Sequence, residues 1–174
     1  MPLRDIMTAW HDLFMLFGTA SATLVGLLFV ATSVGSSYFN ETKRPALRSF
    51  FSPSVVHFGS VLAACLIALT PLRSQVVFGL LIGGDGLFGL IYAITVLTRM
   101  VHHGFTATID WEDRAWYAAL PAIAYAVMMA AGFMLRSEPE AGCDILATAM
   151  GMLMLIGVRN AWDITIWTVM RRSD

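Results

Sequence analysis

Long apolar stretches alternate with short polar ones along the chain, and nearly all charged residues fall in the short polar ones. An α-helix needs about 20 apolar residues to cross the hydrocarbon core of a bilayer. Stretches of that length predict five transmembrane helices, at about residues 13–35, 52–72, 76–98, 115–135 and 143–166. We therefore expect an all-α, polytopic membrane protein with a single transmembrane domain over residues 1–174.

The ends of these stretches carry further signals. Residues 2–12 place Leu3, Ile6 and Trp10 on one helical face, which predicts a short amphipathic lead-in at the outer membrane interface. Thr70-Pro71 ends the second stretch, and only a few residues separate it from the third. The second and third helices should therefore form a tight hairpin.

Composition excludes several classes of protein. The chain is 57% hydrophobic and 13% charged, whereas soluble domains are about 45–50% apolar and about 25% charged. Two cysteines are too few for a secreted disulfide scaffold. The net charge of −1 argues against nucleic acid as a partner. The lipid bilayer is therefore the expected environment.

The distribution of Lys and Arg predicts the orientation, because cytoplasmic loops are enriched in both. With five spans, seven basic residues lie on the side of the C-terminus and three on the side of the N-terminus. We expect a bacterial cytoplasmic (inner) membrane protein with its N-terminus outside and its C-terminus in the cytoplasm. The seven are Lys43, Arg44, Arg48, Arg99, Arg114, Arg171 and Arg172, and the three are Arg4, Arg73 and Arg136.

Asp85 is the first candidate functional residue. It lies near the middle of the third predicted span, among Gly83, Gly84 and Gly86. A carboxyl group in a membrane is costly and is a functional hypothesis by default, here as a protonatable or cation-coordinating centre. The alternatives are a neutral Asp85 that only joins two helices, or a span boundary that places it nearer the outer surface.

Arg159 and Asp163 form the second candidate pair. Their i, i+4 spacing puts both on one face of the fifth span, and His57 lies at a similar depth in the second. The three side chains would suit a gate or a proton-linked latch. The alternative is an arginine that reaches the interface beside its helix partner and sets the depth of the helix. A direct Asp85–Arg159 pair is not expected, since the two differ in depth by roughly 10 Å.

Small residues recur every four positions in three spans, a spacing that lets membrane helices pack closely. Most of this packing is expected within the chain, but three such faces also favour contact between copies. We expect a homo-oligomer in which an aqueous path runs between copies. The small residues are Gly18, Ala22, Gly26, Gly59, Ala63, Gly79 and Gly83.

No motif in the chain indicates an enzyme. The sequence has no GxSxG, no HExxH and no P-loop. Its methionines and histidines do not have the spacing of a metal site, so we expect no cofactor and no metal.

The segments Gly26–Ala31 and Arg159–Asp163 resemble small multi-span bacterial inner-membrane proteins. The resemblance implies a bacterial cytoplasmic membrane, and it implies neither a substrate nor a catalytic residue.

Two functions follow from these features. The first is a small homo-oligomeric channel or transporter for an inorganic ion or protons, with Asp85 as its titratable centre. The second is a non-transporting accessory or structural subunit that binds other membrane subunits through its small-residue faces.

Overall fold

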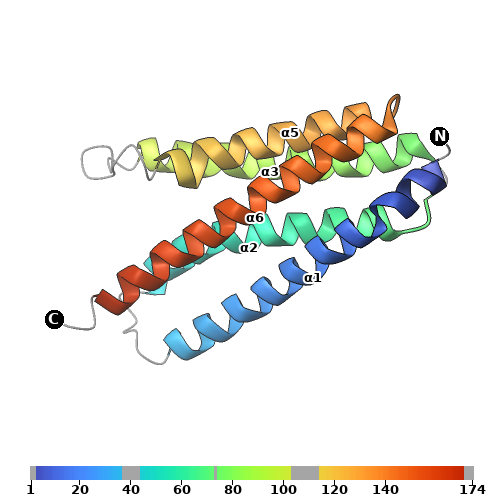
Figure 1. The fold of residues 1–174 in the computed structure, drawn as a ribbon. Coiled ribbons are helices and arrows are strands. Elements are labelled where there is room, and N and C mark those ends of the chain that lie inside the picture. The colour runs from blue at the N-terminus through green and yellow to red at the C-terminus, as the bar shows by residue number, and fades with distance from the viewer. Residues whose placement is uncertain (1–2, 37–43, 73, 103–113, 171–174) are drawn as a thin grey trace.

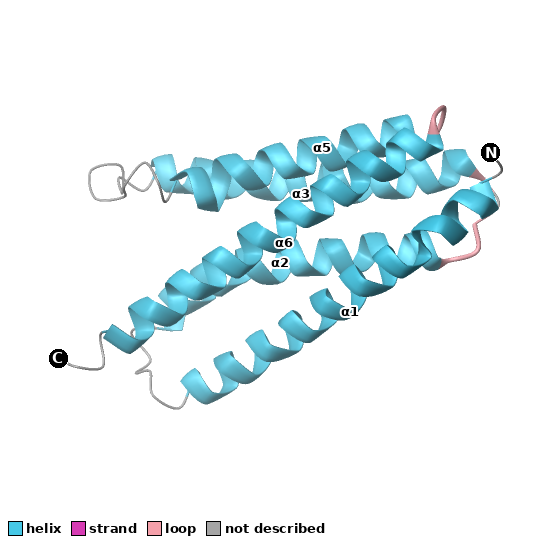
Figure 2. Ribbon diagram, in the orientation of Figure 1, coloured by secondary structure: helices cyan, strands magenta, loops and turns pink. Residues whose placement is uncertain are grey.

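The part of the chain that the structure describes is almost entirely helical (Figure 2). This computed structural model describes residues 3–36, 44–72, 74–102 and 114–170, without the side chains of residues 4, 34–36, 44–52, 99–102 and 164–170. The elements are α1 (Leu3–Ser36), α2 (Arg44–Leu69), α3 (Gln75–His102), the π-helical turn η3 (Ala115–Ala119), α5 (Leu120–Met134) and α6 (Pro139–Met170). Because η3 continues into α5, the described chain forms five helices, as the apolar stretches predict.

The helices run alternately up and down in one elongated bundle (Figure 1). α1 packs on α2, α3 packs on α5, and α6 contacts both α2 and α5. The N-terminus, the α2–α3 connection and the α5–α6 turn lie at one end, here called the N-terminal end (Figure 1). The C-terminus lies at the opposite, C-terminal end. The expected hairpin is confirmed, since α2 ends at Leu69 just before Pro71 and α3 begins at Gln75.

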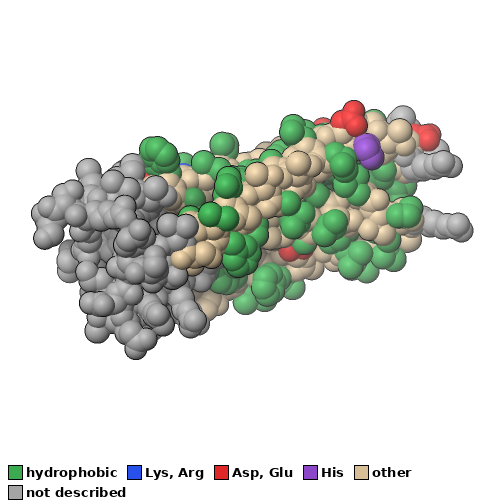
Figure 3. All heavy atoms as spheres, turned by 90° about the horizontal axis from the view of Figure 1, so that it is seen from below, with side chains coloured by type: hydrophobic (Ala, Val, Ile, Leu, Met, Phe, Trp, Pro, Cys, Tyr) green, Lys and Arg blue, Asp and Glu red, His purple; other side chains and the backbone are tan. Residues whose placement is uncertain are grey.

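The outer surface of the bundle is strongly apolar. Leu16, Phe133 and Leu155 are 65%, 68% and 71% exposed, and apolar side chains cover much of the described length in Figure 3. Such a surface is costly in water but suits the hydrocarbon interior of a membrane. By length and hydropathy, four helices of the described chain qualify to cross a membrane, and the apolar segment Pro53–Leu69 of α2 is shorter.

The amphipathic segment at the N-terminus is part of α1 and not a separate helix. Leu3 and Ile6 are buried in the core, whereas Asp5, His11 and Asp12 are exposed. The predicted amphipathic pattern is therefore present. Its apolar face packs against the bundle, because α1 continues without a break into the predicted first span.

Proline explains the irregular start of α5. Pro121 has no backbone N–H, and its ring would clash with the carbonyl group one turn earlier. The chain responds with one π-helical turn, in which the Leu120 N–H donates to the Ala115 carbonyl oxygen. This turn sets the rotation of Trp116 and Tyr117 relative to α5.

Helices α3 and α5 cross at short range, through glycines on both helices. A Cβ atom placed on Gly132 would lie 2.6 Å from Gly83 Cα and 2.7 Å from the Gly79 carbonyl oxygen. One placed on Gly86 would lie 2.7 Å from the Met129 backbone nitrogen. Only glycine allows the two backbones to approach this closely.

Candidate functional site

Asp85 lies on α3 and accepts a hydrogen bond from a neighbouring helix. Ser60 of α2 donates through its hydroxyl group to Asp85 Oδ1 at 2.8 Å. The second carboxyl oxygen, Oδ2, is shielded and has no hydrogen-bond partner in the described part of the chain. One oxygen of the carboxyl group is thus held in place, while the hydrogen-bonding capacity of the other is unused among the described residues.

His57 lies on the same helix as Ser60 and binds a tyrosine on α5. His57 Nδ1 and the Tyr125 hydroxyl group are 3.0 Å apart, and the two ring centroids are 5.6 Å apart. His57 and Ser60 are three residues apart and so lie on one face of α2. The pairs His57–Tyr125 and Ser60–Asp85 are therefore neighbours, and these four side chains from three helices are called the polar cluster.

The cluster depends on a closely packed environment. Tyr125 is fully buried, and its ring lies against Gly89 of α3, where any Cβ atom would overlap it. The His57 ring is 1% exposed. Tyr125 and His57 are therefore enclosed in the bundle, whereas Asp85 is partly exposed and its Oδ2 atom is shielded.

Arg159 and Asp163 form the predicted i, i+4 ion pair on α6. The Arg159 guanidinium also lies over the Trp116 ring, with Cζ 5.3 Å from the centroid. Both side chains of the ion pair are partly exposed. The pair therefore lies on the side of the bundle toward the C-terminal end, joined to the π-helical turn.

The predicted site residues thus separate into two groups. Asp85 and His57, expected at different depths, belong to two neighbouring hydrogen-bonded pairs, Ser60–Asp85 and His57–Tyr125. Arg159 and Asp163 pair with each other, as expected, and Asp85 bonds to Ser60 and not to Arg159. Two members of the cluster, Ser60 and Tyr125, were not predicted, because a lone hydroxyl group in an apolar stretch carries no distinctive sequence signal.

The small residues have different environments. Gly79 and Gly83 form the α3–α5 crossing, and Gly18 of α1 lies against Cys65 of α2. Added Cβ atoms on Gly26 and Gly59 would meet nothing within 4 Å. Ala22 is exposed and Ala63 is partly buried. The crossing also uses Gly86 and Gly89, which continue the pattern along α3, and Gly132 of α5, which faces them.

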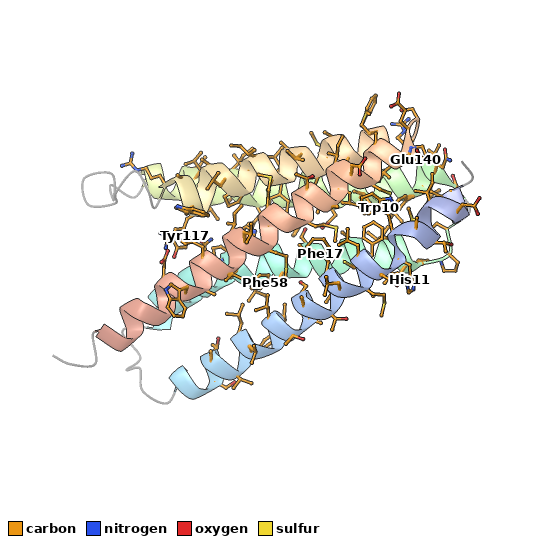
Figure 4. All side chains as sticks on the ribbon, viewed as in Figure 1. Trp10, His11, Phe17, Phe58, Tyr117 and Glu140 are labelled. Carbon is orange, nitrogen blue, oxygen red and sulfur yellow. The ribbon has the colours of Figure 1, made fainter. Side chains whose placement is uncertain are left out.

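Other sequence features are placed as follows. Figure 4 shows Phe58 of α2 within the bundle, Tyr117 toward the C-terminal end, and His11 and Glu140 at the N-terminal end. Cys65 and Cys143 are both buried and free. Ten basic residues were used to predict the orientation. The structure describes the side chains of two of them, Arg114 and Arg136, and the other eight side chains are not among those described. No cluster of three metal-ligating side chains occurs among the residues that the structure describes.

Comparisons with protein-family models, curated proteins and solved structures found no match to this chain. The functional argument therefore depends on the chemistry of the polar cluster.

Proposed function

We propose that the chain is a small channel or transporter for an inorganic ion or protons, working as a homo-oligomer with Asp85 as its titratable centre. The observation that carries the proposal is the environment of the Asp85 carboxyl group. Oδ1 accepts from Ser60, whereas Oδ2 is shielded and lacks a partner among the described residues. A carboxyl group that only joined two helices would not need a second, enclosed and unpaired oxygen.

The proposed setting is a bacterial cytoplasmic membrane crossed five times, with the N-terminus outside. The distribution of Lys and Arg supports the orientation. The apolar outer surface supports insertion, and the length of α2, Arg44–Leu69, supports counting it as the second span. The exposed small residues Ala22 and Gly26 of α1 support contact between copies.

The same two residues favour the second candidate function, a non-transporting accessory or structural subunit. In that case Ala22 and Gly26 would pack against a different membrane protein, and Asp85 would serve only to hold α3 against α2.

Flux measurements on purified protein in liposomes distinguish the two functions. We expect the wild-type chain to move protons, Na⁺ or K⁺, and Asp85→Asn to reduce that flux by about tenfold or more, because it removes the titratable group without changing the side-chain size. The matched control is Asp144→Asn, which makes the same change at an exposed position on α6 and should leave flux unchanged.

The mass of the detergent-solubilised complex, measured in parallel, tests the oligomer. We expect a multiple of 19.0 kDa for the wild type and for both variants. A strict monomer would contradict the homo-oligomer. Background flux in the wild type, with an effect of Asp85→Asn on stability alone, would establish the accessory role instead.

A further inference from the structure

Three buried side chains on α2 and α6 carry polar atoms without partners. Ser54 and His57 of α2 and Asn160 of α6 are 0%, 1% and 0% exposed. Ser54 Oγ, His57 Nε2 and both amide atoms of Asn160 have no hydrogen-bond partner within the described residues. Buried polar atoms in folded proteins are nearly always paired, either with protein or with ordered water. These four atoms therefore require a polar partner that the described residues do not supply.

Helices α2, α3, α5 and α6 form a ring around a common axis. α2 packs on α3 and α6, and α5 packs on the same two helices. α2 and α5 thus lie diagonally across the ring, and the His57–Tyr125 hydrogen bond joins them through its centre. The Tyr125 ring lies against Gly89 of α3, and the Phe58 ring of α2 lies against Gly157 of α6. These contacts define one layer of the ring, here called the His57–Tyr125 layer.

The next layer toward the C-terminal end consists of short, buried side chains. α2 and α5 run away from that end, whereas α3 and α6 run toward it (Figure 1). One helical turn is therefore a step of three or four residues backward on α2 and α5, and forward on α3 and α6. From the contacts of the His57–Tyr125 layer, these steps lead to Ser54, Ala93, Pro121 and Asn160, all of which are buried.

Ser54 faces the interior of this ring. With about 100° of rotation per residue, Ser54 lies about 60° to one side of His57 and about 40° to the other side of Phe58 on the α2 surface. His57 reaches across to α5, and Phe58 reaches α6. The direction of Ser54 therefore falls between α5 and α6.

Asn160 faces the same region from α6. Its direction lies between that of Gly157, which contacts Phe58 of α2, and that of Arg159, which reaches Trp116 of η3. Both Ser54 and Asn160 are thus directed into the space that α2, α5 and α6 surround.

The layer of Ser54 and Asn160 offers more room than the layer on the opposite side. One turn toward the N-terminal end, α2, α5 and α6 present the larger apolar side chains of Val61, Met128 and Leu153, all 0% exposed. Toward the C-terminal end, α2 and α6 separate from α3 and α5 (Figure 1), while the side chains become shorter. A wider part of the ring is therefore lined by smaller side chains, among which unpaired polar atoms are concentrated.

We propose that Ser54, His57 and Asn160 line an internal hydration site, in which ordered water bridges α2 and α6 on the axis of the ring. Water fits because hydroxyl and amide groups both donate and accept, as water does. None of the three side chains carries a fixed charge, and the nearby charges of Arg159 and Asp163 compensate each other, so the site suits water and not an ion. It is separate from the Ser60–Asp85 pair, and the inference does not depend on transport.

Asn160 gives a direct measurement, because the chain contains only one other asparagine, Asn40. Water-edited solid-state NMR of asparagine-labelled protein in lipid bilayers measures magnetisation transfer from water to each side-chain amide, and Asn40→Ser removes the other signal. We expect rapid transfer to the Asn160 amide at short mixing times. The control is the methyl group of Met128, which is equally buried and lies on the apolar side. Transfer to Asn160 as slow as transfer to Met128 would overturn the hydration site.

Ser54→Ala tests whether Ser54 and Asn160 share the same water. We expect this variant to shift the Asn160 amide signal and to reduce its transfer from water, because one of the groups that hold the water is removed. The matched control is Ser60→Ala, a buried serine on the same helix whose hydroxyl group bonds to Asp85, and it should leave the Asn160 signal in place. Circular dichroism checks that both variants keep the wild-type helix content. An Asn160 signal unchanged in Ser54→Ala, or shifted equally in both variants, would overturn the shared site. If Ser54→Ala does not fold, the wild-type measurement decides.

Discussion

The Ser60–Asp85 hydrogen bond joins α2 to α3 through the one acidic residue in the middle of α3. A hydrogen bond between helices in a membrane contributes about 0.6 kcal/mol on average and at most roughly 1.7 kcal/mol. This bond is therefore too weak by itself to explain why a carboxyl group is placed there at a cost of a few kcal/mol. Because the carboxyl group costs more than the hydrogen bond contributes, this comparison favours a role for Asp85 beyond helix packing.

A double-mutant cycle with Ser60→Ala and Asp85→Ala measures that bond. We expect a coupling energy of about 0.6 kcal/mol, and no more than roughly 1.7 kcal/mol, from detergent unfolding curves. Ser60→Ala combined with Asp144→Ala should be additive, because Asp144 is exposed on α6. A coupling energy of several kcal/mol would show that the bond is mainly structural.

Asp85, His57, Arg159 and Asp163 can be predicted from the sequence because ionisable groups are conspicuous in apolar segments. The hydrogen-bond partners of His57 and Asp85 cannot be predicted in this way. Ser60 and Tyr125 resemble many other hydroxyl-bearing residues in membrane helices, and only the packing of α2, α3 and α5 brings them to His57 and Asp85.

At the scale of the helices, the α3–α5 crossing holds the polar cluster together. Gly79, Gly83 and Gly86 of α3 contact α5 at Gly132 and Met129, and Gly89 contacts the ring of Tyr125. Tyr125 can therefore reach His57, while Asp85 reaches Ser60, only if α3 and α5 remain in this close contact. The glycines position the cluster without taking part in its chemistry.

Gly132→Ala tests the crossing. Its Cβ would overlap backbone atoms of Gly83 and Gly79, which cannot rotate away, so we expect a loss of stability of about 1–3 kcal/mol or more in thermal or detergent unfolding. The matched control is Gly84→Ala, where a Cβ meets nothing within 4 Å. We expect Gly84→Ala to leave the free energy of unfolding unchanged or to raise it by up to about 1 kcal/mol. Equal stability of the two variants would contradict the close crossing.

At the scale of the whole molecule, the span count decides which groups face which side of the membrane. With five spans, the N-terminus and the α5–α6 turn lie on the same side. If α2 did not cross, they would lie on opposite sides. The question depends on α2, whose apolar part, Pro53–Leu69, is the shortest of the five.

Labelling in intact cells answers this question. Ser137 is exposed in the α5–α6 turn, and both native cysteines are buried. We expect Ser137→Cys to react with a membrane-impermeant maleimide from outside, and an N-terminal epitope tag to be accessible from the same side. Permeabilised cells provide the control for reactivity. Labelling of Ser137→Cys and of the tag from opposite sides would exclude five spans.

The sequence by itself determined the helical class, the approximate ends of the helices and the short list of charged residues inside them. These features follow from local hydropathy and from the cost of charge in an apolar medium, so they can be read along the chain. Only the tertiary structure decided that His57 pairs with Tyr125 and Asp85 with Ser60, and that Gly86, Gly89 and Gly132 form the crossing. Those contacts join residues from different helices, and their geometry depends on helix rotation and crossing, which hydropathy does not specify.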